Sequence, residues 1–301
     1  MTVAMRAVLA AWLVLAASGP VHAADATPEE LAALFQEKIV ETRLEMTLAD
    51  GRLSGPGADL LRTMAAEARF FMIGEEHGSA TMGDFATALV ADLGGLGYAH
   101  AAIEVDPWMA AKLEALQRDA SPRALDDYLV YDERMLSLPM YSWVSDARFT
   151  RAIVAANGNK APALWGLDQV FIGAASVLFA DIAAGTVNAE ARALAADLAT
   201  RAKGDLQFLG TVGEATLTKL AGLLGDPADA NLKTLVDAMI VSARIYEPFM
   251  ENGTGSAYAA NLDRENLMKM TFLAHYRATR ARDGSPPRVV LKFGAYHLYR
   301  G

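Results

Sequence analysis

The sequence predicts an α/β fold with a mainly parallel central sheet flanked by helices. Short apolar runs alternate along the chain with longer stretches of helical pattern, as in βαβ units. Polar residues follow the apolar runs, and open α/β sheets place ligands at the carboxyl ends of their strands. The predicted strands are residues 69–73, 99–105, 163–167 and 288–293.

Helical patterns connect these strands. The first helix is predicted over residues 27–46, with Thr27 as its N-cap, Pro28 at the first helical position and apolar residues from Leu31 to Val40 along one face. A loop over residues 51–57 follows it. The other helices that flank the sheet are expected over residues 58–68, 82–96, 107–118, 149–156 and 261–282.

Residues 174–250 are rich in alanine and leucine and almost wholly helical in pattern. We interpret them as a helical insertion that forms one wall of the substrate cleft, and not as a separate domain. Residues 24–301 are therefore expected to form a single α/β domain. The chain stops a few residues after its last predicted strand without a closing helix, so we expect the sequence to be incomplete after Gly301.

Residues 1–23 have the pattern of a secretory signal peptide. Arg6 supplies a positive charge, residues 7–17 are apolar, and the segment ends in the small-residue sequence Val21-His22-Ala23. The apolar run is too short for a permanent membrane anchor, and nothing later in the chain resembles a membrane span. We expect cleavage between Ala23 and Ala24 and a periplasmic or secreted protein.

Composition excludes several classes of function. The formal net charge is −9, and an acidic chain argues against a nucleic-acid partner, which would require a basic surface. The sequence contains no cysteine, so thiolate nucleophiles, cysteine-bound metals and disulfides are excluded. A small-molecule substrate is the partner that we expect, and the sequence does not predict an oligomeric state.

Carboxylate and imidazole side chains that could take part in acid–base catalysis lie at the ends of the predicted strands. Glu75, Glu76 and His77 follow the first strand, and Glu104 closes the second. Asp168 follows the third strand and His297 the fourth. If these strands lie side by side, the residues meet at one rim, where acid–base catalysis has its partners within hydrogen-bond reach.

Several of the candidates also have a simpler interpretation. Glu75, Glu76 and His77 between glycines fit an ordinary turn before a helix. Glu104 lies in an apolar run, where a carboxylate is costly unless it is paired, so a structural ion pair is an alternative to a catalytic role. Arg264 could pair with Asp263 or Glu265 beside it, or reach into the site as an anion clamp.

The ordered motifs resemble those of the erythromycin esterase family. The segments that carry the resemblance are IGEEHGS, AAIEVDPW, the strand end GLDQ, LDRENLMKMTFLAHY and RVVLKFGAYH. The resemblance spans most of residues 69–301 and implies an exported hydrolase of the erythromycin esterase-like superfamily that cleaves an ester or lactone. By this resemblance, His77 is the general base that activates water, and Glu75 and Glu104 orient the base and the water. His297 matches the terminal catalytic histidine.

The same resemblance implies that Arg264 and Asp168 line the substrate cleft, with Glu76 beside them, and that no cofactor is needed. The turn Gly-Glu-x-His is one residue shorter than in the esterases and is more like the ChaN-like and Tiki group. Two alternatives therefore stay open. One is a ChaN-like protein that binds haem or iron, and the other is a metal-dependent hydrolase or peptidase with Glu75, His77 and Glu104 as ligands.

Overall fold

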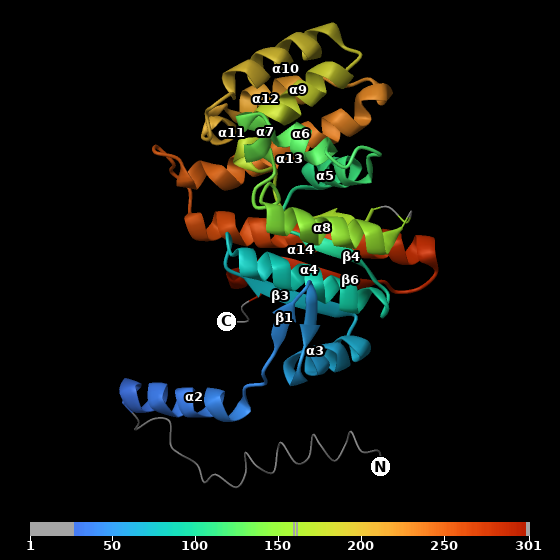
Figure 1. The fold of residues 1–301 in the computed structure, drawn as a ribbon. Helices are drawn as coiled ribbons and strands as arrows, with labels where there is room; N and C mark the ends of the chain where they lie inside the picture. The colour runs from blue at the N-terminus through green and yellow to red at the C-terminus, as the bar shows by residue number, and fades with distance from the viewer. Residues whose placement is uncertain (1–26, 159, 161, 299–301) are drawn as a thin grey trace.

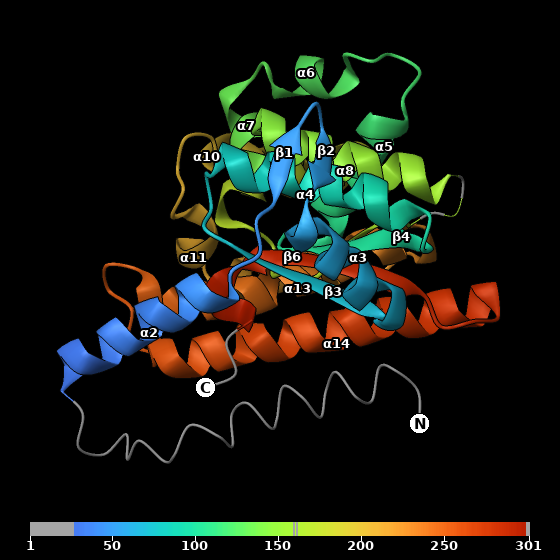
Figure 2. The same ribbon diagram turned by 60° about the horizontal axis from the view of Figure 1, so that its bottom comes forward.

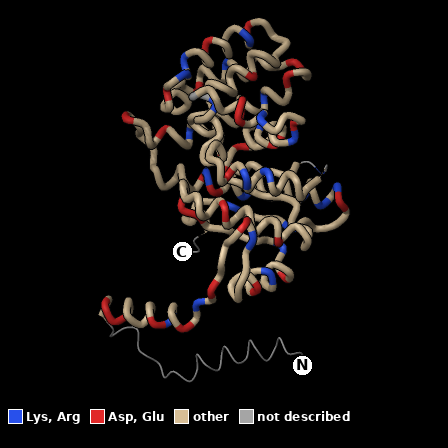
Figure 3. Tube along the Cα trace, viewed as in Figure 1, with Lys and Arg blue, Asp and Glu red and all other residues tan. Residues whose placement is uncertain are grey.

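The structure of the protein is a computed structural model that describes residues 27–298 apart from residues 159 and 161. The predicted signal peptide, residues 1–23, lies outside the described residues. The described helices include none that is long and apolar enough to span a membrane. Acidic and basic side chains are interspersed along the described trace (Figure 3).

The centre of the molecule is a four-stranded parallel sheet. Its strands are β3 (Phe70–Glu75), β4 (Tyr98–Ile103), β5 (Leu164–Gly166) and β6 (Arg288–Gly294). They lie in the order β3-β6-β4-β5, so the last strand in the chain inserts between the first two. All four overlap the strands predicted from the sequence, and the predicted fold class is confirmed.

Helices cover both faces of this sheet (Figure 1 and Figure 2). On one face, α4 (Ala80–Gly94) and α8 (Val144–Asn157) pack on side chains such as Ile73 and Val290. On the other face, α14 (Ala257–Asp283) packs on Leu291 and Trp165. Neighbouring residues of a strand point to opposite faces, which is why Val290 and Leu291 belong to different cores.

The remaining helices form a second layer above the sheet (Figure 1). Residues 174–250 are helical, as predicted from their pattern, whereas α6 and α7 were not predicted. The helices of this layer are α5 (Pro107–Arg118), α6 (Ala124–Leu129), α7 (Asp132–Ser137), α9 (Ala175–Gly185), α10 (Ala189–Arg201), α11 (Phe208–Thr211), α12 (Glu214–Leu223) and α13 (Ala230–Tyr246). Short 3-10 turns flank them at Ile172–Ala174, Pro227–Asp229 and Glu247–Phe249.

The N-terminal segment differs from its prediction in two ways. Helix α2 (Pro28–Thr42) begins at the predicted cap, where Thr27 and Glu30 form a reciprocal capping box, but none of its residues is buried. Its apolar side chains are exposed, and the helix lies below the sheet and away from it in Figure 1. The loop expected over residues 51–57 is instead largely a strand and a helix start: β1 (Thr47–Ala49) pairs with β2 (Arg52–Ser54), and α3 (Pro56–Glu67) follows.

Candidate active site

The carboxyl ends of the strands bring the predicted site residues together. Glu75 ends β3, and Glu104 follows β4 directly. Asp168 follows β5, and His297 lies in the 3-10 turn Ala295–Leu298 after β6. Arg264 reaches this rim from α14, so residues from five elements of the chain meet there.

Glu104 accepts hydrogen bonds from three other residues of this cluster. Its Oε1 accepts hydrogen bonds from Arg264 Nη2 at 2.8 Å and from His297 Nε2 at 3.0 Å. Its Oε2 accepts the backbone N–H of Gly294 at 3.0 Å. Burial opposes ionisation of this carboxyl, but the hydrogen bonds from His297 and Gly294 and the charges of His297 and Arg264 outweigh it and lower the pKa of Glu104 to about 2. Glu104 is therefore a fixed anion and not a proton carrier.

Asp168 holds the guanidinium of Arg264 in a two-point ion pair. Arg264 Nε donates to Asp168 Oδ1 at 2.8 Å and Nη2 to Asp168 Oδ2 at 2.6 Å. The sequence left open a local partner for Arg264, and the structure instead gives it partners on two strands. Arg264 Nη1 makes no hydrogen bond to a described residue, so its two N–H groups remain available to a ligand.

His297 is held between two carboxylates. Its Nδ1 lies 2.6 Å from Glu265 Oε1, and its Nε2 lies 3.0 Å from Glu104 Oε1. The hydrogen bond with Glu104 outweighs burial and raises the pKa of His297. The raised pKa favours the protonated ring, in which both ring nitrogens donate to carboxylates, so neither nitrogen is free to accept a proton.

His77 is the more accessible imidazole, with 40% of its side chain exposed. Its Nδ1 lies 3.2 Å from Glu75 Oε1, and its Nε2 lies 3.5 Å from Glu104 Oε2, longer than a strong hydrogen bond. A Cβ at position 294 would stand 2.9 Å from His77 Nε2, so glycine is what leaves room for the ring. A neutral His77 that donates from Nδ1 to Glu75 presents Nε2 as a base.

Three further charged residues support the cluster, and the sequence analysis assigned none of them. Lys292 is fully buried and forms ion pairs with Glu75 and with Asp146, the latter at 2.7 Å. Glu265 is the partner of His297 described above. The available signal for Lys292 was a single lysine inside the apolar strand RVVLKF, where a buried charge demands a partner.

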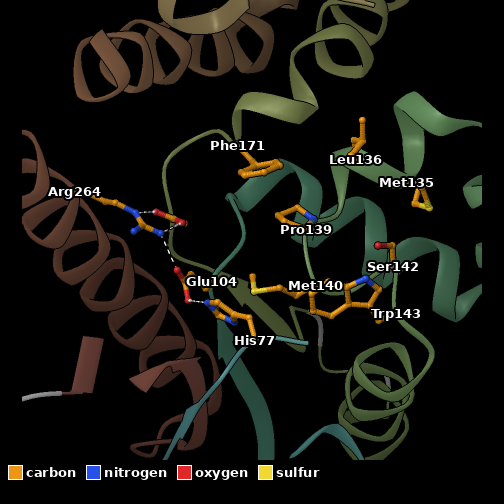
Figure 4. A pocket seen from close by; sticks show the side chains of 11 residues that line it. His77, Glu104, Met135, Leu136, Pro139, Met140, Ser142, Trp143, Phe171 and Arg264 are labelled. Atoms are coloured by element: carbon orange, nitrogen blue, oxygen red, sulfur yellow. Dashed lines mark hydrogen bonds and ion pairs between the residues drawn. The ribbon is translucent and has the colours of Figure 1, made fainter. Parts of the chain in front are cut away.

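Two pockets meet at this cluster, and His77, Glu104 and Arg264 line both. One pocket, of about 460 Å³, has apolar walls (Figure 4). These walls consist of Met135, Leu136, Pro139, Met140, Trp143 and Phe171. The other, of about 680 Å³, is acidic, and it includes Glu75, Glu265 and the exposed Glu76. The Glu76 side chain makes no hydrogen bond to a described residue, and it lines this pocket.

The helical insertion supports the apolar wall from behind. The apolar residues that line the pocket belong to the segment from Met135 to Trp143 and to the loop after β5. That loop is held by the insertion, since the backbone N–H of Val170 donates to Ser242 Oγ at 2.8 Å and that of Ile172 to the Tyr246 hydroxyl at 3.2 Å. The insertion thus sets the position of Phe171.

The proposed ligand set Glu75, His77 and Glu104 does not suit a metal ion. In the described chain, no group of three or more such side chains is placed to hold one. The reason is that both carboxylates already have cationic partners. Lys292 forms an ion pair with Glu75, while Arg264 and His297 form ion pairs with Glu104. These cationic side chains contact the carboxylate oxygens that a metal ion would need as ligands.

Comparisons with known proteins agree with this fold. No family profile matches the chain, and no curated protein matches its sequence. Among solved structures, a mutant of erythromycin esterase EreC in its open conformation superposes with a TM-score of 0.53 at 14% identity, over 84% of this chain and 68% of that one. A succinoglycan biosynthesis protein gives a TM-score of 0.51 at 16% identity, over 86% of this chain and 66% of that one.

This chain thus spans about two thirds of the length of either solved structure. At these identities the likeness concerns the fold and not the activity. The resemblance expected from the ordered motifs is confirmed at that level: the chain has the fold of erythromycin esterase.

Proposed function

We propose that the protein is a hydrolase that cleaves an ester or lactone with water activated by His77. One observation carries this proposal. His77 lies where an apolar pocket and an acidic pocket meet, with Nδ1 3.2 Å from Glu75 Oε1 and Nε2 3.5 Å from Glu104 Oε2, too far for a strong hydrogen bond. His297, by contrast, has both ring nitrogens engaged by carboxylates.

Glu75, His77 and Arg264 each have a separate role in the proposed reaction. Glu75 accepts the Nδ1–H of His77 and fixes the ring so that Nε2 takes a proton from water. The water oxygen forms a bond to the carbonyl carbon, and the charge on the carbonyl oxygen develops near the unengaged Nη1 donors of Arg264. The carbon–oxygen bond of the ester then breaks, and His77 returns its proton to the leaving oxygen.

The apolar pocket suits a hydrophobic portion of the substrate, because its walls are methionine, leucine, proline and aromatic side chains. The erythromycin esterase likeness favours ester chemistry over other hydrolysis. The predicted signal peptide favours action in the periplasm or outside the cell.

A panel of chromogenic esters and lactones tests the proposal. We expect His77→Gln to lose about 100- to 10,000-fold in kcat, the usual contribution of a general base. His275→Gln is the matched control, because His275 stacks on Trp165 outside both pockets. Hydrolysis by His77→Gln at the wild-type rate would contradict the mechanism. A visible absorbance band on purified protein, or activity abolished by a chelator, would favour haem binding or a metal enzyme.

A further inference from the structure

Lys292 is a cation sealed inside the protein next to the catalytic rim. Its side chain is fully buried, with ion pairs to Glu75 Oε2 and, at 2.7 Å, to Asp146 Oδ1. The rings of Tyr141 and Phe149 face its ammonium at 5.5 Å and 5.6 Å. Lys292 therefore contacts neither pocket, and any effect on a substrate must pass through its partners.

The sheet register explains how this lysine reaches Glu75. In the parallel pairing of β3 with β6, Lys292 stands opposite Ile73, two residues before Glu75. Residues two apart in a strand share a face, so Ile73, Glu75 and Lys292 all point toward α8, which carries Asp146. The face that holds the ammonium is thus the one that holds the Glu75 carboxylate.

Stability alone is a weak reason for this arrangement. Taking a lysine and two carboxylates out of water is costly, and apolar residues of similar volume are often as stabilising as a buried ion pair. What the ion pair does define is the orientation of Glu75. One oxygen, Oε2, is held by Lys292, and the other, Oε1, is the atom that faces His77 Nδ1 at 3.2 Å.

We propose that Lys292 is a positioning residue that acts through Glu75 on His77, an inference that rests on the proposed function. Without Lys292, the Glu75 and Asp146 carboxylates would be buried together and would lose the cation that pairs with both of them. Glu75 Oε2 would have no partner to hold it in place, and His77 would lose the positioned acceptor of its Nδ1–H.

The test is a kinetic double-mutant cycle on Glu75 and Lys292. We expect Lys292→Met to lower kcat about 10- to 100-fold, with KM within about threefold of the wild type, as for partners that orient a catalytic group. Glu75→Gln should lose a similar factor, and the double variant should be no slower than Glu75→Gln alone. Losses that multiply in the double variant would overturn the proposal, because they would show a role independent of Glu75.

Two controls keep the outcome clear. Glu114→Gln changes another buried carboxylate, which accepts the backbone N–H groups of Ala163 and Leu164 and lines neither pocket, and should leave kcat unchanged. If Lys292→Met does not fold, Lys292→Met combined with Asp146→Asn removes one charge of each sign and is compared with Asp146→Asn alone.

A spectroscopic measurement separates this inference from the proposed function. Nitrogen NMR of the imidazoles reports which ring nitrogen carries the proton and needs no substrate. In the wild type His77 should be the Nδ1–H form, and in Lys292→Met this preference should be lost, with His275 as internal reference. An unchanged His77 signal would refute the role of Lys292 even if the protein is an esterase. A wild type without esterase activity would refute only the proposed function.

Discussion

Replacing Glu104 by glutamine should cost substantial stability at neutral pH. The carboxylate gathers Arg264, His297 and the Gly294 N–H, and its pKa falls from the usual 4.5 to about 2. That difference corresponds to about 3 kcal/mol of stability held by the ionised form. Because Glu104 is only 7% exposed, screening by solvent removes little of it. Glu104→Gln keeps the shape of the side chain and loses this contribution.

The effect should depend on pH in a defined direction. A carboxyl whose pKa is lowered by folding contributes its full stability above the unfolded value, and the contribution is lost as the pH falls from 4.5 toward about 2. The difference between wild type and Glu104→Gln should therefore shrink from about 3 kcal/mol near pH 7 to about 1 kcal/mol near pH 3.

Urea unfolding followed by circular dichroism at several pH values measures this difference. Glu214→Gln is the matched control, because Glu214 also pairs with an arginine, Arg244, but on the surface, and should unfold like the wild type. Equal stability of wild type and Glu104→Gln at neutral pH, or a difference that does not vary with pH, would refute the description of Glu104 as a fixed anion.

Two further predictions follow from the rim. Gly294→Ala should place a methyl group 2.9 Å from His77 Nε2 and displace the imidazole ring. We therefore expect kcat to fall about 10- to 100-fold while the free energy of unfolding in urea changes little. A variant with wild-type kcat would contradict the position of His77. Burial, opposed by hydrogen bonds from the backbone of Met109, raises the pKa of the helix cap Asp106 to about 7. The contribution of Asp106 to the free energy of unfolding should therefore fall as the pH rises from about 4 to about 7. In urea unfolding at several pH values, Asp106→Asn should depend less steeply on pH than the wild type. An equal pH dependence of the two proteins would contradict the raised pKa of Asp106.

Much of the fold and site followed from local patterns. Apolar runs gave the four strands, and polar residues at their ends gave the cluster, because parallel strands end at a common rim. Thr27 and Pro28 marked the start of α2 for the same local reason.

What could not be predicted depends on contacts between distant segments. Nothing local indicates that Lys292 faces Asp146, or that Arg264 prefers Asp168 and Glu104 to its neighbours in the helix. The apolar wall from Met135 to Trp143 comes from short helices and turns with little periodicity. The amphipathic pattern of α2 predicted a helix correctly but could not show whether its apolar face would be covered.

The central position of β6 has a consequence for how this chain comes to its native form. β3 and β4 do not pair with each other, since the strand between them begins at Arg288. The four-stranded sheet therefore cannot assemble until the strand that begins at Arg288 has left the ribosome, and such distant pairing slows folding. For the exported protein that we propose, slow completion of the sheet is an advantage, because an unfolded chain is the form that a translocase carries.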